Sequence, residues 1–185
     1  MEQRELVERA RRGDHDAFAL LAGGAVTRLD AAARLILRDR ELARDAVQEA
    51  LVRAWRDLPG LRDPERFDAW LHRLIVNACI DQARIRRRRP IEVEIGPIFT
   101  ASTPDETQMV ADRDLVERAL ARLGPEHRAV VVLHYYFGMP LPEAAAMLGI
   151  PVGTAKSRLN RAIGSLRRSL EPDRHETELE GRRLV

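Results

Sequence analysis

Cysteine and lysine are almost missing from this sequence of 185 residues, which contains only Cys79 and Lys156 of these types. A single cysteine excludes an internal disulfide and any zinc site built from several cysteines. Cys79 lies in an apolar helical run, so we interpret it as a small buried hydrophobic residue. Nearly all positive charge is arginine, which suits paired hydrogen bonds to phosphate and guanine, although a GC-rich genome would also produce an arginine-rich chain.

Long apolar runs are also absent. No stretch approaches the roughly 18 residues needed to span a bilayer, and residues 1–12 are charged and lack the apolar centre of a signal peptide. Hydrophobic residues make up 45% and charged residues 32% of the chain, which is typical of soluble globular proteins. The sequence therefore predicts a cytoplasmic protein without membrane insertion.

Patterns that carry catalysis or bind metal ions are missing as well. The histidines are scattered and form no HExxH or other ligand spacing. No glycine-rich phosphate loop or nucleophile elbow occurs in the chain. We therefore predict no catalytic residues, no metal site, no cofactor and no enzyme activity. The five histidines are His15, His72, His127, His134 and His175.

The N-terminal half, residues 1–89, has a helical pattern throughout. Apolar residues recur at helical spacing between Ala43 and Leu58, and the sequence Leu58-Pro59-Gly60 ends that helix. A short loop at 60–64 follows. The next predicted helix begins near Phe67 and runs into an arginine cluster at 84–89.

Residues 90–111 differ from both flanking regions. They contain three prolines and four acidic residues but no lysine or arginine, and they show no helical period. This composition predicts a flexible, acidic linker. A short strand at 91–95, where apolar and acidic residues alternate, is the alternative. The charged, aperiodic residues 171–185 predict a disordered tail.

The segment from Pro142 to Leu170 has the pattern of a helix-turn-helix. Two apolar-faced helices are separated by a short turn that contains Gly149. From Pro151 to Leu170 there are five basic residues and no acidic one. A basic helix face suits phosphate neutralisation, and arginine side chains read guanine edges in the major groove. A solvated basic face without a ligand is the alternative.

Short sequence patterns in both halves resemble one family. The ordered set resembles the bacterial RNA polymerase sigma factors of the extracytoplasmic-function (ECF) type, and the resemblance extends from about Glu5 to Leu170. The patterns that carry it are Arg12-Gly13-Asp14, Ala17-Phe18, Asp45-Ala46-Val47-Gln48-Glu49, Phe67-Asp68-Ala69-Trp70-Leu71, Asn77, Asp81, Arg84, and Gly153-Thr154-Ala155-Lys156-Ser157-Arg158-Leu159 followed by Arg161-Ala162.

The resemblance implies a division of labour between two domains. The first domain is expected to bind the clamp helices of the largest subunit of core RNA polymerase and to open the −10 promoter element. The second is expected to read the −35 element in duplex DNA and to contact the flap of the second-largest subunit. The acidic linker is expected to thread towards the active-site and RNA-exit channel. An anti-sigma factor is a further expected partner.

The candidate residues follow from the resemblance and the helical spacing. For the polymerase they are Asp45, Gln48 and Glu49, which share a polar helix face. For opened −10 DNA they are Asn77, Asp81, Arg84 and Arg88, at i, i+4, i+7 and i+11. For −35 DNA they are Gly153, Thr154, Lys156, Ser157, Arg158 and Arg161.

For several of these residues, a role without any ligand is the alternative. The acidic face of Asp45 could be merely solvated, and Asp81 could merely hold an arginine. Trp70 could stack on a base, but closing the edge of the core is the favoured reading. Two adjacent glycines, Gly23 and Gly24, depart from the family pattern and predict a break or a weak point in their helix.

The sequence therefore predicts an all-α protein. Its expected parts are a first domain at 1–89, a linker at 90–111, a second domain at 112–170 that ends in the helix-turn-helix, and a tail at 171–185. A conventional helix-turn-helix regulator is disfavoured because the first half shows neither a long heptad seam nor a ligand-pocket signature. An adaptor without DNA binding is disfavoured by the basic helix.

Overall fold

The computed structural model describes residues 2–88 and 120–170, and all regular structure within these ranges is helical. The predicted all-α class is therefore confirmed for the described residues. The predicted linker at 90–111, its alternative strand at 91–95 and the predicted tail at 171–185 lie outside the described residues. No helix in the described ranges is long and apolar enough to cross a membrane.

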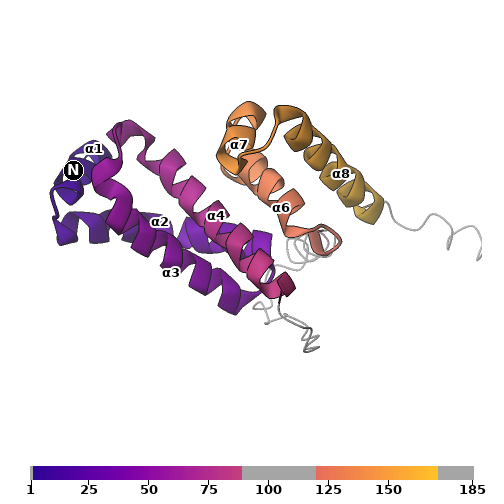
Figure 1. Cartoon of the computed structure of the whole chain (residues 1–185), viewed down its shortest axis with the longest axis horizontal. Helices are drawn as coiled ribbons and strands as arrows, with labels where there is room; N and C mark the ends of the chain where they lie inside the picture. The colour runs from indigo at the N-terminus through magenta and orange to yellow at the C-terminus, as the bar shows by residue number, and fades with distance from the viewer. Residues whose placement is uncertain (1, 89–119, 171–185) are drawn as a thin grey trace, which may run out of the picture.

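The first group of helices packs into a bundle, which lies at the indigo-to-magenta end of Figure 1. Two short 3-10 turns, Leu58–Gly60 and Pro64–Arg66, connect the third of these helices to the fourth. The four helices are α1 (Gln3–Arg11), α2 (His15–Leu37), α3 (Arg40–Asp57) and α4 (Phe67–Arg88).

The first bundle has two chain reversals that the helical pattern of residues 1–89 did not predict. Gly13 adopts a positive φ of 92°, and the next residue, Asp14, caps α2 by accepting a hydrogen bond from the backbone N–H of Ala17. This bond lowers the pKa of Asp14, and its hydrogen bond with Arg9 adds to the shift. Arg38, with a φ of 56°, ends α2 in the left-handed region.

Of the two alternatives at Gly23 and Gly24, a break in α2 does not occur. The helix runs without interruption through Gly23 and Gly24, and nothing lies within 4 Å of a Cβ built at either position. Each glycine costs roughly 1 kcal/mol relative to alanine in a helix interior. Buried residues on both sides, Leu21 and Leu29, hold the helix on the bundle and offset that cost.

The second group contains the predicted helix-turn-helix, formed by α7 and α8. Before it, α6 begins at Pro125, because proline suits the first turn of a helix, where its missing N–H has no partner to lose. Gly149, with a φ of 64°, makes the turn between α7 and α8. The elements are α6 (Pro125–Val131), the π-helical segment η3 (Val132–Tyr136), α7 (Leu141–Leu148) and α8 (Val152–Leu170).

The hydrophobic core continues from the first group into the second. Phe67, Leu71 and Ile75 from the first bundle belong to the same buried cluster as Leu133 and Met139 from the second group. A smaller cluster joins Leu120, Leu123 and Ala162, with Leu35 of α2 packed against it. Consequently α6 lies against α2 and α4, and α7 lies against α4, beside which both are seen in Figure 1.

Candidate nucleic-acid and partner interfaces

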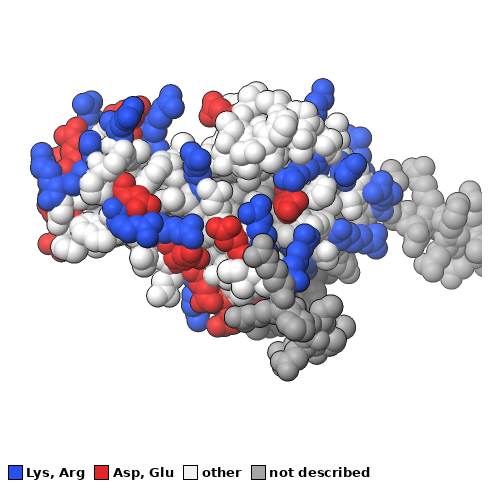
Figure 2. Space-filling model, in the orientation of Figure 1, with Lys and Arg blue, Asp and Glu red and all other residues white. Residues whose placement is uncertain are grey.

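The outer face of α8 is basic, as the sequence predicted. Lys156, Ser157 and Arg161 are exposed, whereas Ala155 and Ala162 are fully buried on the opposite side. Small buried alanines allow α8 to lie close to α6 and α7. Figure 2 shows Lys and Arg side chains gathered over the second group of helices, with few acidic ones among them on this face.

Arg158 differs from its neighbours on α8. Its side chain is only 22% exposed, and its guanidinium lies 3.2 Å from a carboxylate oxygen of Glu126 on α6. Ser157 uses its hydroxyl to donate a hydrogen bond to the backbone oxygen of Thr154, one turn earlier. The structure therefore leaves Arg161 and Lys156 open to solvent, while Arg158 is held against its own domain.

The predicted DNA flank of α4 is part polar and part basic. Asn77 and Asp81 are half-buried, and Arg84 is exposed. Arg88 lies in the last turn of α4, and its side chain is outside the description. Asp81 has carboxylate oxygens 3.8 Å from Arg53 and 3.7 Å from Arg84. These contacts favour the reading that Asp81 positions arginines.

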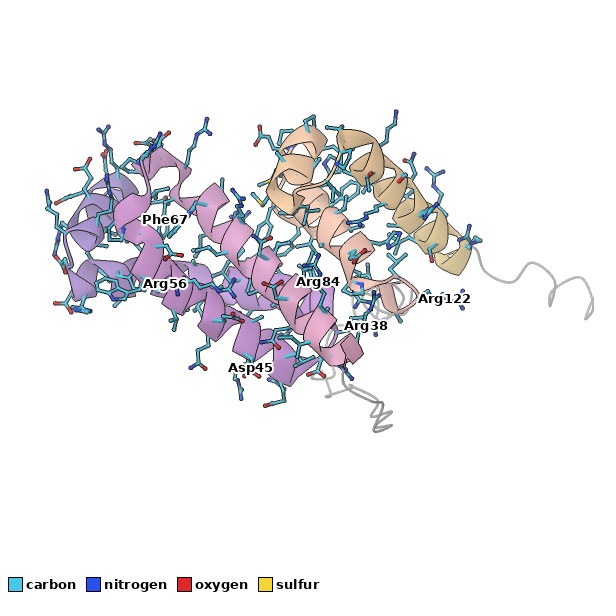
Figure 3. All side chains as sticks on the ribbon, viewed as in Figure 1. Arg38, Asp45, Arg56, Phe67, Arg84 and Arg122 are labelled. Atoms are coloured by element: carbon cyan, nitrogen blue, oxygen red, sulfur yellow. The ribbon has the colours of Figure 1, made fainter. Side chains whose placement is uncertain are left out.

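Of the three residues on α3 that were predicted to contact the polymerase, two are exposed. Asp45 and Gln48 are exposed, but Glu49 is half-buried and forms an ion pair with Arg53, one turn along the same helix. Arg53 therefore links Glu49 on α3 to Asp81 on α4. Figure 3 shows Asp45 on the outer side of α3, on the far side of that helix from α6.

A groove beside this face was missed by the sequence reasoning. It has a volume of about 710 Å³ and lies between α2 and α3. Val52, one of its lining residues, is 61% exposed, which is unusual for a large apolar side chain in a bundle. Its lining consists of Phe18, Val26, Thr27, Asp30, Arg34, Arg44, Val47, Gln48, Leu51, Val52 and Trp55. The sequence signal that could have revealed the groove was Val52, an apolar residue on the polar side of its helix.

The two tryptophans are packed by neighbouring rings. Trp55 lies with its ring centroid 4.4 Å from that of His15 and 5.1 Å from that of Phe18, at one side of the groove. Trp70 is half-buried against the core, and its ring centroid is 6.0 Å from that of Phe67. This position agrees with the reading that Trp70 closes the core edge.

Cys79 is completely buried, as expected of a small hydrophobic residue. Burial raises the pKa of its thiol to about 12, so the reactive thiolate is disfavoured. Among residues 2–88 and 120–170, no three His, Cys, Asp or Glu side chains come together as a metal site.

Two family profiles match the chain. The profile described as Sigma-70 region 2 matches residues 26–89, and the profile described as Sigma-70, region 4 matches residues 113–166. The first match covers most of α2 and all of α3 and α4. The second covers α6, α7 and most of α8, so the two matches contain all of the candidate interface residues.

Named relatives and solved structures agree with the profiles. The chain is 41% identical over 136 residues to the ECF RNA polymerase sigma factor SigL of Mycobacterium tuberculosis, covering 72% of this chain and 77% of the relative. The structure of CnrH in complex with the cytosolic domain of CnrY aligns with a TM-score of 0.64 and 32% identity, over 92% of this chain and 98% of that chain. The sigma factor RpoE in complex with the anti-sigma factor NepR from Bartonella quintana aligns with a TM-score of 0.61 and 29% identity, over 84% and 95%.

Proposed function

The chain belongs to the extracytoplasmic-function family of RNA polymerase sigma factors, and we propose that its two groups of helices divide promoter recognition between opened and duplex DNA. As a sigma factor, it binds core RNA polymerase and directs promoter-specific initiation of transcription. Sigma factors have no catalytic step of their own, and we propose the same for this chain. Its proposed place of action is the cytoplasm, where polymerase and promoters are found.

The domain division that supports this proposal is the one expected from the sequence. A first domain at 1–89 is proposed to bind the polymerase and the −10 element, and a second domain at 112–170 is proposed to bind the −35 element. The family matches at 26–89 and 113–166 support this division. The acidic residues 90–111 are proposed to thread between the domains towards the RNA-exit channel, and residues 171–185 are proposed to be a tail that belongs to neither domain.

Duplex recognition is assigned to α8. The exposed Lys156 and Arg161 follow a tight turn at Gly149 on a helix that has no acidic residue. A helix that emerges from such a turn fits the major groove, and its arginines can contact base edges and phosphates. Gly153, Thr154, Ser157 and Arg158 complete the proposed −35 surface.

Opened −10 DNA is assigned to the flank of α4. Asn77 and Arg84 share one side of the helix, and Asp81 between them contacts Arg84. An amide and a guanidinium can bond to unpaired base edges and to a single-strand backbone. Arg88 extends the same flank by one further turn.

Core polymerase is assigned to α3 and to the groove beside it. Asp45 and Gln48 offer polar groups, and the neighbouring Val52 offers an exposed apolar contact. Gln48 lines the groove itself, so the polar face and the apolar groove form one continuous surface. The clamp helices of the largest subunit are the proposed occupant, and the flap of the second-largest subunit is proposed to contact the second domain. An anti-sigma factor is a further proposed partner, because a sigma factor of similar structure binds one.

The observation that carries this division is the contrast between a straight basic helix, α8, and a mixed polar flank on α4. It is tested with holoenzymes that contain Asn77→Ala or Arg161→Ala, on single-strand −10 and duplex −35 probes at one salt concentration. Asn77→Ala should weaken only single-strand binding, by about 1 kcal/mol or more. Arg161→Ala should weaken only duplex binding, by about 1–3 kcal/mol.

Matched variants control for indirect effects. Gln82→Ala removes an amide from another face of α4, and Arg66→Ala removes an exposed arginine far from α8 in sequence. Both should leave the two affinities unchanged. If Asn77→Ala and Arg161→Ala weaken both probes equally, the two surfaces form one DNA track and the proposed division is wrong.

A further inference from the structure

A single arginine lies between the face of α3 assigned to the polymerase and the flank of α4 assigned to −10 DNA. Arg53 donates a hydrogen bond to the carboxylate of Glu49, one turn earlier on α3. Its other terminal nitrogen lies 3.8 Å from a carboxylate oxygen of Asp81 on α4. All three residues are half-buried, so each is held by its neighbours and is still reached by water. Arg53 therefore serves two carboxylates on two helices.

Asp81 is shared in turn between two arginines. Its other carboxylate oxygen lies 3.7 Å from a terminal nitrogen of Arg84, one turn later on α4. Both contacts of Asp81 are longer than a normal hydrogen bond of roughly 2.7–3.2 Å. A carboxylate at such distances from two cations can approach either one more closely. Glu49, Arg53, Asp81 and Arg84 therefore form a row of alternating charges that joins one assigned surface to the other.

This row of charges contributes little to the stability of the fold. Ion pairs that water can reach add little to folding, because water screens their attraction. The contact between α3 and α4 is instead held by fully buried apolar residues such as Ala50 and Ala78. Arg84, at the end of the row, is exposed and can leave Asp81 for another anion. The main consequence of the row is therefore where the guanidinium of Arg84 lies.

We propose that Arg53 is a positioning residue for −10 recognition: by attracting Asp81, it sets how readily Arg84 leaves Asp81 to bind a phosphate of the opened strand. The proposal rests on the assignment of Arg84 to −10 DNA. Without Arg53, Asp81 has one cation instead of two and holds Arg84 more closely. Glu49 competes with Asp81 for Arg53. A positive group of a partner at Glu49 would therefore release Arg53 to Asp81, and Arg84 to DNA.

The test is a cycle of variants in the holoenzyme, formed with excess core polymerase, on a single-stranded −10 oligonucleotide. Arg53→Ala should weaken binding about twofold to fivefold, the range expected for one ion pair that water can reach. Asp81→Asn keeps the shape of the side chain and removes its charge, so in its background Arg53→Ala should change the affinity little. Arg53→Lys, which keeps the positive charge, should retain most of the affinity. Glu49→Gln should act in the opposite direction and tighten binding.

Salt dependence and a matched arginine show whether the effect passes through Arg84. Arg84→Ala should reduce the slope of log affinity against log salt by about 0.7, the value for one phosphate of a single strand. Arg53→Ala should reduce it by part of that amount, whereas a merely structural effect would leave the slope unchanged. Arg56→Ala is the control, because Arg56 is an exposed arginine of α3 that pairs with Asp57 of the same helix, and Figure 3 shows it well away from Arg84. It should change neither affinity nor slope.

A readout without DNA separates this proposal from the assignment of the −10 flank. The NMR order parameter of the side-chain Nε–H of Arg84, in the free full-length chain, should rise in Arg53→Ala and fall in Asp81→Asn. An unchanged order parameter would refute the positioning of Arg84, and so would an equal loss of affinity from Arg53→Ala with and without Asp81→Asn. No loss from Arg53→Ala, where Arg84→Ala does weaken binding, would refute it as well. If the order parameter changes as expected but Arg84→Ala leaves −10 affinity unchanged, Arg53 positions Arg84 and the assignment of Arg84 to −10 DNA is what fails.

Discussion

The two groups of helices bury their apolar residues in different ways. The first group has large, fully buried side chains such as Phe67, Leu71 and Ile75 on its own helices. In the second group, Leu133 and Met139 are buried in the same cluster as those residues. The cluster centred on the second group is small, and it includes contact with Leu35 of α2. The first group therefore forms a core, and the second group shares it.

This difference shows how a short helix-turn-helix unit can be folded with only a small core of its own. A short unit with a small core gains stability from whichever apolar surface covers it. In the structure that surface belongs to α2 and α4. The shared core thus links the stability of the second group to the state of the whole chain.

The largest expected effect tests whether the core is shared. Leu71→Ala in α4 and Leu133→Ala in η3 each remove a buried side chain and should each cost about 2–5 kcal/mol. With a shared core, both variants lower one common unfolding transition, followed by circular dichroism in urea. Leu20→Ala, at an exposed position of α2, is the control and should have little effect. Two separate transitions, each shifted by only one variant, would contradict a shared core.

The fold was predictable where local patterns decide it. The second helix of the predicted helix-turn-helix is present as α8 and ends at Leu170 as predicted, because an apolar stripe and a glycine turn specify it. The reversal at Arg38 was missed, since it needs a non-glycine residue with positive φ, which no pattern signals. The sequence left open a break or a weak helix at Gly23 and Gly24, and the structure shows no break, because packing of flanking residues outweighs a weak helix propensity.

The next effect concerns the proposed polymerase surface on α3 of the first group. Replacing Asp45, Gln48 and Glu49 together with alanine should weaken binding to core polymerase by about 2 kcal/mol, a typical loss at an interface hot spot. Fluorescence anisotropy of the labelled chain with purified core polymerase measures this. Helicity should be unchanged, because none of the three side chains is fully buried.

A matched triple variant on α1 controls for lost surface charge. Glu2, Gln3 and Glu5 are exposed and also combine two acidic residues with an amide. Their replacement with alanine should leave polymerase affinity unchanged. If the triple variant of Asp45, Gln48 and Glu49 binds core polymerase as tightly as the parent chain, the docking surface lies elsewhere. The groove beside Val52 is then without its proposed occupant.

The candidate site was only partly predictable from sequence. Helical spacing correctly placed Asn77 and Arg84 on one side of α4, since a helix fixes which residues share a face. It could not show that Glu49 and Asp81 both contact Arg53, because the second of these contacts depends on how α3 crosses α4. The bonds of Arg128 join residues far apart in sequence, so no local pattern could reveal them.

A smaller effect separates two arginines of the second group. Arg161 is exposed, whereas Arg158 is paired with Glu126. Arg161→Ala should therefore cost about 1–3 kcal/mol of −35 affinity if it reads a base. Arg158→Ala should lose less affinity but also lower stability, by about 1 kcal/mol or less, because it breaks a half-buried ion pair. Competition binding with single-base variants of the −35 element and urea unfolding measure the two quantities.

Glu126→Gln sharpens this contrast from the other side of the pair. It keeps the shape of the side chain and removes the charge that holds Arg158. Duplex affinity should rise slightly at low salt, because Arg158 becomes free to contact a phosphate. A loss of affinity would instead mean that Glu126 holds Arg158 in its reading position.

A further effect is a pH dependence at the contact between the two groups. Burial lowers the pKa of His72 to about 4 from its ordinary value of 6.5; the positive charge of Arg28 adds to the shift, and Asp68 opposes it. His72 is therefore neutral where its ring stacks on Phe137 of the second group, and it would take up a proton if separation of the two groups exposed it. Above about pH 6.5 His72 does not affect the packing of the two groups. As the pH falls towards 4, proton uptake by His72 increasingly favours their separation.

At about one pH unit below 6.5 the packing of the two groups should lose about 1 kcal/mol of stability. Energy transfer between dyes attached through Arg62→Cys and Glu143→Cys, at exposed positions of the first and second groups, should fall accordingly. His72→Phe keeps a ring against Phe137 but cannot titrate, so its transfer should be nearly constant over this range. His127, whose pKa is also lowered by burial, is controlled by His127→Gln, which should keep most of the pH dependence. Equal slopes in the parent and in His72→Phe would show that the proton is taken up elsewhere. If energy transfer becomes independent of pH only in His72→Phe, protonation of His72 is what weakens the contact between the two groups in acid.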